Sequence, residues 1–146
     1  VDLLEERITE AQKKCPDETH LHTGTASSIQ YPDQFFDIVL QATVMSSILQ
    51  PSLKEQMAGE MLRVVKKQGV IIWYDFFMNN PNNKQVRGIR KQEIKKLFPG
   101  CRIALKKTTL APPLGRLVAP YSEFLGILFE SLPFLCTHYI GIITQK

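Results

Sequence analysis

Few side chains in this 146-residue chain have the chemistry to take a proton from a bound substrate. Tyr74 and Asp75 stand at the end of one apolar run. Tyr121 lies within the apolar stretch 117–135, and His138 directly precedes the last apolar run. A general base must also lie within hydrogen-bond reach of its target, and residues at such positions are more often structural. His20 and His22 alternate along an extended stretch, but two histidines alone do not make a metal site. We therefore assign no metal ligand and leave the catalytic residue unknown.

The three cysteines, Cys15, Cys101 and Cys136, are far apart and never form a CxxC pair. Their odd number and spacing predict neither a disulfide framework nor a zinc knuckle. Three reduced thiols are typical of a cytoplasmic protein, which is the location we expect. No basic-then-apolar signal segment opens the chain, and prolines and glutamates interrupt its most apolar stretch, residues 117–135. We therefore expect no membrane span.

A basic cluster follows the Asn-rich stretch Met78–Gln85 and consists of Arg87, Arg90, Lys91, Lys95 and Lys96. Such a cluster is most often a solvated helix face. Alternatively, it could hold an anionic acceptor such as a phosphate-bearing glycan or lipid. No aromatic residues are interleaved with the cations, which argues against stacking on single-stranded nucleic acid. We therefore expect no nucleic-acid partner.

The composition is that of an ordinary globular protein. Hydrophobic residues make up 44% of the chain and charged residues 22%, with a formal net charge of +4. These values exclude collagenous, low-complexity and intrinsically disordered chains. The length suits one domain or part of one.

Two strands and a helix between them dominate the pattern. Phe35–Leu40 and Val70–Tyr74 are strand-forming runs without polar alternation, as in inner strands covered on both faces. The stretch between them has an apolar stripe at helical spacing, Pro51 at its start, and Lys66, Lys67 and Gly69 at its end. Strand, helix and strand predict a βαβ unit with parallel strands.

Shorter elements flank this unit. Helical spacing and capping signals predict helices from about Leu4 to Lys14, from about Arg90 to Phe98, and from about Tyr121 to Leu132. Three further strands are predicted at Thr19–Thr23, Cys101–Leu110 and Tyr139–Thr144. Interspersed cations mark Cys101–Leu110 as an exposed edge.

The order of these segments resembles the second and larger part of a class I S-adenosylmethionine-dependent methyltransferase, of the small kind called methyltransferase type 11. Gly24-Thr25-Ala26, followed by the string YPDQFFDIV at 31–39, looks like the adenine-side loop and fourth strand of that family. The string EMLRVVKKQG at 60–69 looks like the helix end before its fifth strand. The resemblance covers nearly the whole chain.

The resemblance implies an α/β fold. We expect a Rossmann-like, three-layer methyltransferase sheet that is mostly parallel. Its antiparallel last strand, Tyr139–Thr144, should lie between Val70–Tyr74 and the edge strand Cys101–Leu110. Residues 1–146 would then be one incomplete methyltransferase domain, its C-terminal part, starting at the end of the second strand.

The same resemblance implies a cofactor site for S-adenosylmethionine formed by Asp2, Leu3, Thr25, Ala26 and Gln41. Asp2 would accept hydrogen bonds from the ribose diol, and Leu3 would pack on the adenine. Thr25 stands where the family usually has aspartate, so a neutral contact replaces a charge-assisted one. Gln41 would lie beside the methionine part, while Ser46 and Ser47 stand where many relatives carry a histidine.

One family motif is missing. None of the eight glycines lies two positions from another, so the GxGxG loop that follows the family's first strand is not on this chain. We expect the first strand, that loop and the first helix to lie outside residues 1–146. The chain by itself should then expose an unpaired apolar edge, form a homodimer or aggregate, and bind the cofactor weakly. A non-catalytic methyltransferase-fold remnant acting as an interaction module is the alternative, and another basic α/β domain is a third.

The implied function is methyl transfer from S-adenosylmethionine to an unidentified small-molecule or lipid-linked acceptor. Transfer from a sulfonium depends chiefly on alignment, and a base is needed only for a protonated acceptor. In this family the segment between the last two strands, here Ala111–Leu135, commonly covers the methyl group. The segment is apolar, with Arg116 its only cation, and the basic cluster follows a neighbouring loop. An apolar cover beside a cationic rim favours an amphiphile, although the apolar side chains could merely pack the helix onto the sheet.

Overall fold

The computed structural model describes residues 1–79, 83–118 and 120–146. Its centre is a four-stranded sheet in the order β1-β2-β4-β3, formed by Phe36–Ala42 (β1), Val65–Phe76 (β2), Cys136–Thr144 (β4) and Arg102–Leu110 (β3). β1 and β2 are parallel, whereas β4 is antiparallel to both β2 and β3. The predicted α/β class and the predicted place of the last strand are confirmed.

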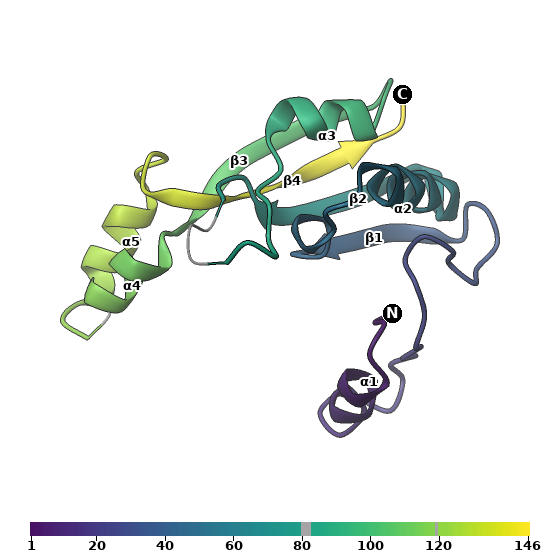
Figure 1. Ribbon diagram of the computed structural model, residues 1–146, viewed down its shortest axis with the longest axis horizontal. Coiled ribbons are helices and arrows are strands. Elements are labelled where there is room, and N and C mark those ends of the chain that lie inside the picture. The colour runs from purple at the N-terminus through teal and green to yellow at the C-terminus, as the bar shows by residue number, and fades with distance from the viewer. Residues whose placement is uncertain (80–82, 119) are drawn as a thin grey trace.

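Two helices cover one face of this sheet. The crossover helix α2 (Pro51–Val64) and the short helix α3 (Lys91–Leu97) pack over the strands in Figure 1. Met57 and Met61 of α2 and Ile94 of α3 join Trp73 in the buried core. The Lys54 ammonium, almost fully buried, lies 2.9 Å from a Glu93 carboxylate oxygen and links the two helices.

The turn between α2 and β2 is shorter than the sequence predicts. The helix was expected to continue to about Lys67, but it ends at Val64, and β2 begins at the next residue. Val65 pairs with Phe36 across the two strands before the register shifts. A side chain at Gly69 would place its Cβ only 2.7 Å from the Asp37 carbonyl oxygen. Gly69 therefore belongs to the strand, where it permits this close approach.

The N-terminal segment stands apart from the sheet, with helix α1 (Glu5–Gln12) at its far side (Figure 1). The prediction of a strand at Thr19–Thr23 is wrong: within the described ranges only one parallel bridge forms there, between Asp2 and Thr23. A strand needs a partner along its length, and an isolated pair of strands is marginally stable.

Two short helices precede β4 where one was predicted. Helix α5 (Glu123–Glu130) lies within the predicted range, whereas α4 (Pro112–Val118) was not predicted. Its Pro112, Pro113 and Gly115 suggest a loop, but prolines in a first turn are compatible with a helix. Asn80, Pro81 and Asn82 of the Asn-rich stretch lie outside the described residues. No helix in the described ranges is long and apolar enough to cross a membrane.

The sheet has an open edge and a bare face. β1 hydrogen-bonds only to β2 within the described sheet, so its other edge is unpaired. Four apolar side chains on the face opposite α2 are between 42% and 64% exposed: Ile38, Leu40, Ile140 and Ile142. The apolar run of β1 predicts an inner strand covered on both faces, but only one face is covered here: Val39 packs against the core, while Ile38 and Leu40 on the other face are exposed. An unpaired apolar edge of the kind expected from the sequence is therefore present on β1.

We predict that the 146-residue chain by itself self-associates through this surface, and that replacing Ile38 and Leu40 together by lysine reduces the association. Exposed lysines oppose edge-to-edge pairing of strands, and both side chains are more than half exposed, so folding should be little affected. Light scattering after gel filtration measures the oligomeric state. As a control, Ser52→Lys with Gln56→Lys adds the same charge on the exposed side of α2 and should leave the oligomeric state unchanged. A monodisperse, thermally stable wild-type monomer would contradict the prediction.

Candidate functional site

A buried polar cluster joins the carboxyl ends of β1 and β2. The Gln41 amide nitrogen donates to Asp75 Oδ2 over 3.1 Å, and the backbone N–H of Ser46 donates to the same oxygen over 3.1 Å. Asp75 Oδ1 accepts from the backbone N–H of Phe76 over 2.8 Å. Asp75 has no exposed surface, so these donors replace the water that its carboxyl group loses on folding.

The loop after β1 is held in an unusual conformation by this cluster. Gln41 Oε1 accepts from the Val44 N–H over 3.1 Å, and the Thr43 N–H donates to the Tyr74 carbonyl over 2.8 Å. Thr43 has a φ of +54°, which is uncommon for a β-branched residue. A one-turn 3-10 helix, η1 (Met45–Ser47), follows. The strain and the hydrogen bonds together fix the path of the chain beside the strand ends.

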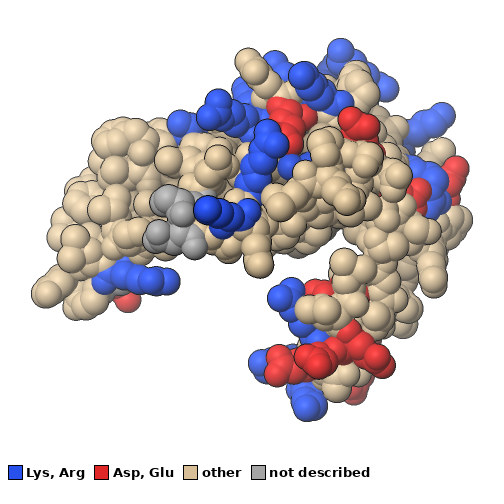
Figure 2. Space-filling view, in the orientation of Figure 1, with Lys and Arg blue, Asp and Glu red and all other residues tan. Residues whose placement is uncertain are grey.

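The carboxyl end of β1 borders a hollow of about 490 Å³, here called the strand-end hollow. Its lining includes Asp2, Leu3, Thr25 and Ala26 from the N-terminal segment and Ala42 and Thr43 from the end of β1. The structure thus brings four of the five residues predicted for the cofactor to one hollow. Figure 2 shows the surface hollowed between the N-terminal segment and the body of the protein.

The fifth residue, Gln41, lies elsewhere. It lines a neighbouring apolar hollow of about 270 Å³ along β1, together with Ala26. Its side chain is 4% exposed, and both its amide oxygen and its amide nitrogen are hydrogen-bonded within the protein. In this structure the Gln41 side chain supports the loop after β1. In the sequence, a polar residue that ends an apolar strand could have indicated this supporting role. Asp75 at the end of β2 shows the same pattern.

Some side chains in the strand-end hollow already bond to other protein groups, and others are open to a ligand. Asp2 accepts from the Leu4 N–H over 2.9 Å through Oδ1, and its Oδ2 lies 3.7 Å from Arg7. Leu3 is 71% exposed and presents an apolar surface. Thr25 Oγ1 lies 2.8 Å from Ser27 Oγ, and Ala26 packs against the core. The hollow therefore offers a carboxylate, a hydroxyl and an apolar plate to one ligand.

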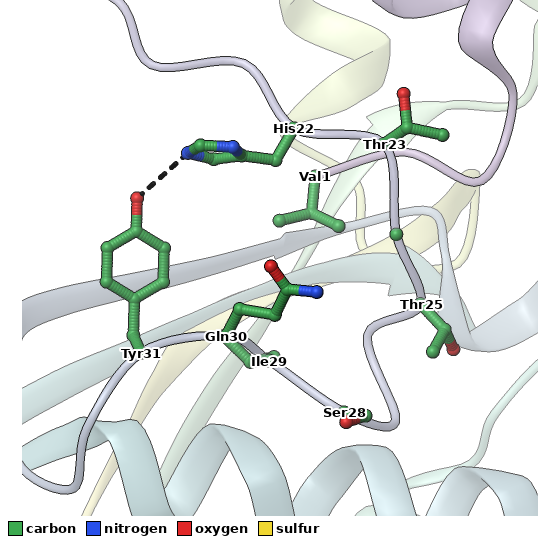
Figure 3. Close-up of a pocket in the computed structure, with 9 residues that line it drawn as sticks. Val1, His22, Thr23, Thr25, Ser28, Ile29, Gln30 and Tyr31 are labelled. Atoms are coloured by element: carbon green, nitrogen blue, oxygen red, sulfur yellow. Dashed lines mark hydrogen bonds between the residues drawn. The ribbon is translucent and has the colours of Figure 1, made fainter.

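A second hollow of about 450 Å³ shares Val1, Gly24 and Thr25 with the strand-end hollow (Figure 3). His22 and Tyr31 stand across its opening, with His22 Nε2 and the Tyr31 hydroxyl 3.2 Å apart. Val1, Thr23, Gly24 and Gln30 are also in its lining. Tyr31 was not among the predicted site residues, because nothing in the spacing of the residues around it sets it apart.

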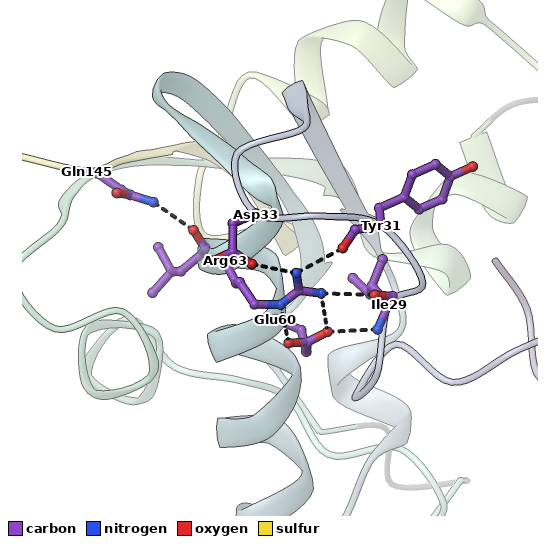
Figure 4. A network of polar contacts seen from close by, with 7 residues as sticks. Ile29, Tyr31, Asp33, Glu60, Arg63 and Gln145 are labelled. Atoms are coloured by element: carbon purple, nitrogen blue, oxygen red, sulfur yellow. Dashed lines mark hydrogen bonds and ion pairs between the residues drawn. The ribbon is translucent and has the colours of Figure 1, made fainter.

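Glu60 and Arg63 clamp the loop before β1 onto α2 (Figure 4). Arg63 donates to both Glu60 carboxylate oxygens, over 2.7 and 2.9 Å, and to the carbonyl oxygens of Ile29 and Tyr31. Glu60 in turn accepts from the Ile29 N–H over 2.7 Å. These contacts, foremost the hydrogen bonds from Arg63, lower the pKa of Glu60 from 4.5 to about 2. The clamp fixes the segment that follows Gly24-Thr25-Ala26.

The candidate bases are occupied or remote. His138 is 4% exposed, and its ring stacks on Tyr74 with centroids 4.8 Å apart. Burial lowers the pKa of His138, although nearby Asp75 opposes this. The Tyr74 hydroxyl lies 2.9 Å from Thr109 Oγ1, and Tyr121 is 84% exposed in the segment between β3 and β4. None of the described residues forms a cluster suited to a metal ion.

A third hollow, of about 800 Å³, gathers cations beside aromatic rings and is called the basic hollow below. It contains Arg90 and Lys91 at the start of α3 and Lys107 of β3, together with Phe77, Phe134 and Tyr139. Lys107 Nζ lies 5.0 Å from the centre of the Phe77 ring. Two cations of the predicted basic cluster therefore face aromatic surface, but the cations Arg87, Lys95 and Lys96 do not line this hollow.

Comparison with known proteins supports the family resemblance seen in the N-terminal half of the sequence. A family model described as "Methyltransferase domain" matches residues 1–73, which is half of the chain. No curated protein matches the sequence.

Similar solved structures show the same fold. A SAM-dependent methyltransferase from Methanosarcina mazei is 14% identical with a TM-score of 0.66, over 99% of this chain and 79% of that one. One from Archaeoglobus fulgidus is 15% identical with a TM-score of 0.68, over 99% and 74%. A SAM-dependent methyltransferase from Thermotoga maritima, described as a possible histamine N-methyltransferase, is 18% identical with a TM-score of 0.70, over 97% and 70%.

We predict that Glu60→Gln weakens the clamp and removes an acid-dependent part of the stability. Because the pKa of Glu60 is lowered to about 2, its stabilising effect is present above pH 4.5 and is lost as the pH falls toward 2. At neutral pH the substitution should lower the free energy of unfolding by about 1 kcal/mol. The loss is small because the Glu60–Arg63 pair is partly exposed and solvent screens it. Urea unfolding measured from pH 7 to pH 2.5 tests this.

Glu55→Gln on the exposed side of α2 is the matched control and should leave the pH profile unchanged. Identical profiles for Glu60→Gln and the wild type would show that the clamp does not contribute to stability.

Proposed function

The chain belongs to the methyltransferase domain family, and on that premise we propose that the protein transfers the methyl group of S-adenosylmethionine to an amphiphilic acceptor with an anionic group. One observation supports the cofactor part above the others. Asp2, Leu3, Thr25 and Ala26 come from two separate stretches of the sequence, yet they line one hollow at the carboxyl end of β1. In open α/β sheets, ligands bind at the carboxyl ends of the strands.

The residues present fit S-adenosylmethionine. Asp2 is half-buried, and its Oδ2 has only a 3.7 Å contact to Arg7, so the carboxylate can accept hydrogen bonds from a ribose diol. The exposed Leu3 side chain suits one face of an adenine ring. The Thr25 hydroxyl can bond the adenine edge once it leaves Ser27. Gln41 would contribute its backbone, since its amide is used by Asp75 and Val44.

When bound, S-adenosylmethionine supplies an electrophilic methyl group on a sulfonium whose leaving group departs neutral. The contribution of the protein is then mainly alignment, which can lower the barrier by several kcal/mol. Asp75 and Gln41 hold the loop Thr43–Ser47 at the strand ends, and this loop also borders the strand-end hollow. We assign these two side chains as positioning residues and leave the catalytic base, where an acceptor needs one, unknown.

The acceptor part of the proposal is supported by the basic hollow. Arg90, Lys91 and Lys107 supply positive charge beside the aromatic rings of Phe77, Phe134 and Tyr139. Phe77, which lines the basic hollow, directly follows the last residue of β2, Phe76. The basic hollow therefore begins where that strand ends. Cations next to aromatic surface suit an acceptor with an anionic group and an apolar body.

The proposal includes a cellular location and an oligomeric state. All three cysteines of the described chain are free, which is consistent with a reducing compartment such as the cytoplasm. The open edge of β1 supports a homodimer of the isolated chain.

We predict that Asp2→Ala in the full-length protein lowers the affinity for S-adenosylmethionine at least about tenfold. The substitution removes two hydrogen bonds to a charged acceptor, each worth roughly 1.5 to 3 kcal/mol. Titration calorimetry measures the affinity. Asp17→Ala removes an exposed carboxylate from the same N-terminal segment and should leave it unchanged. Equal affinities for Asp2→Ala and the wild type would refute the assignment of Asp2.

For the acceptor, we predict that labelled S-adenosylmethionine transfers its label to a component of a lipid extract. Lys107→Ala should slow that transfer by raising KM, because the cation binds the acceptor and does not touch the methyl group. Label found only in a soluble metabolite extract would discard the amphiphilic acceptor and keep the methyl transfer. Label in neither extract, despite cofactor binding, would contradict the enzyme proposal itself.

A further inference from the structure

The segment between β3 and β4 forms an apolar lobe, defined here as residues 112–118 and 120–135. It contains α4, α5 and the turn between them, and it projects from the end of the sheet (Figure 1). Seven of its large hydrophobic side chains are between 40% and 84% exposed: Leu117, Tyr121, Phe124, Leu125, Ile127, Leu128 and Phe134. A soluble monomer rarely exposes so many neighbouring apolar side chains without a binding role.

The lobe has almost no interior of its own. α5 has no buried residue, and in α4 only Val118 is buried. Phe124, Ile127 and Leu128 are spaced three and four residues apart, so they form one stripe along α5. Packing within the lobe therefore does not explain why these side chains are apolar.

The base of the lobe is fixed to the sheet. The Ala111 N–H donates to the Leu135 carbonyl over 2.9 Å, which closes the segment. Glu130 Oε1 at the end of α5 accepts from Thr109 N over 2.9 Å and from Thr108 Oγ1 over 3.1 Å. These contacts hold the exposed stripe in a defined position beside β3.

Several cations lie close to this base. Lys106 and Lys107 directly precede the threonines that bond Glu130, and Arg116 lies on α4. Phe134, which is 74% exposed, lines the basic hollow together with Arg90 and Lys91. Figure 2 shows a broad lobe almost free of charged side chains next to a surface rich in Lys and Arg. The apolar surface and the cationic surface are therefore continuous.

We propose that the apolar lobe docks the protein on a lipid bilayer that contains anionic lipids. The aliphatic and aromatic side chains enter the interfacial region, and the neighbouring cations contact phosphate headgroups. Tyr121 at the turn suits this depth, since its ring is apolar and its hydroxyl remains at the headgroups. A second copy of the chain fits this surface less well, because the cations beside the lobe would face each other. The proposal concerns where the protein binds and stands independently of its catalytic activity.

The experiment measures binding of the purified protein to vesicles. Vesicles of phosphatidylcholine alone are compared with vesicles that also contain phosphatidylglycerol, at low and high salt. We expect tighter binding to the anionic vesicles and weaker binding at high salt, because salt screens the attraction.

Two pairs of substitutions test the two halves of the surface. Phe124→Ser with Ile127→Ser removes apolar side chains that are 72% and 68% exposed, and should reduce binding at least about tenfold. Lys106→Glu with Arg116→Glu removes two cations and adds two anions, and should reduce binding to anionic vesicles at least about twentyfold. Both pairs are exposed, and circular dichroism checks that each variant is folded.

Each pair has a matched control away from the lobe. Lys13→Glu with Lys14→Glu, beside α1, makes the same change in net charge. Leu49→Ser removes an apolar side chain that is 53% exposed in the loop before α2. Neither control should change binding to anionic vesicles.

Three results would overturn the proposal. The first is no binding to either kind of vesicle. The second is a loss of binding that is as large in the control variants as in the lobe variants. The third is a wild-type dimer that the Phe124→Ser and Ile127→Ser pair converts to a monomer without any effect on vesicle binding, which would assign the lobe to a second copy of the chain.

Discussion

The buried carboxyl group of Asp75 is the constraint on which the site depends. A carboxyl group without exposed surface must find donors inside the protein, and here they come from three places: the Gln41 side chain, the Ser46 backbone and the Phe76 backbone. These donors lie on β1, on η1 and on β2. One acidic side chain therefore joins two parallel strands at their carboxyl ends and fixes the loop that leaves the first of them. The uncommon φ of Thr43 follows from these bonds, because the loop must turn sharply to return its N–H groups to β2.

A second anchor complements the first from the opposite end of β1. Arg63 and Glu60 hold the loop at Ile29 and Tyr31 through charge-assisted hydrogen bonds, which are shorter and stronger than neutral ones. Helix α1 lies away from the sheet (Figure 1), and the clamp ties the loop that follows the N-terminal segment to α2. The strand-end hollow lies beside the first anchor, where Thr43, Val44 and Ser47 of the loop after β1 line it.

The sequence predicted the elements that carry their own signal. The apolar runs of β1 and β2 and the stripe of α2 predicted a parallel βαβ unit, whereas the family resemblance predicted the strand order and the antiparallel last strand. Thr19–Thr23 failed because a strand depends on a partner that local sequence does not contain. The role of Gln41 was missed for a similar reason. Its type suggested contact with a ligand, but its partner Asp75 lies 34 residues away and competes for the same amide. The expected cofactor contacts of Asp2, Leu3, Thr25 and Ala26 remain predictions, although the structure brings these residues together.

Three exposed apolar surfaces among the described residues differ in what they can bind. The open edge of β1 presents unpaired backbone N–H and C=O groups, which only another extended chain can satisfy in regular order. The bare face offers aliphatic side chains on a flat sheet, where a helix or a second sheet would pack. The apolar lobe is formed by the helices α4 and α5 rather than by an open strand edge, carries cations at its base and presents a tyrosine at its turn. A bilayer offers neither backbone partners nor a shaped surface, but it does supply hydrocarbon beside negative charge. Of the three surfaces, only the lobe combines the two features that such a partner recognises.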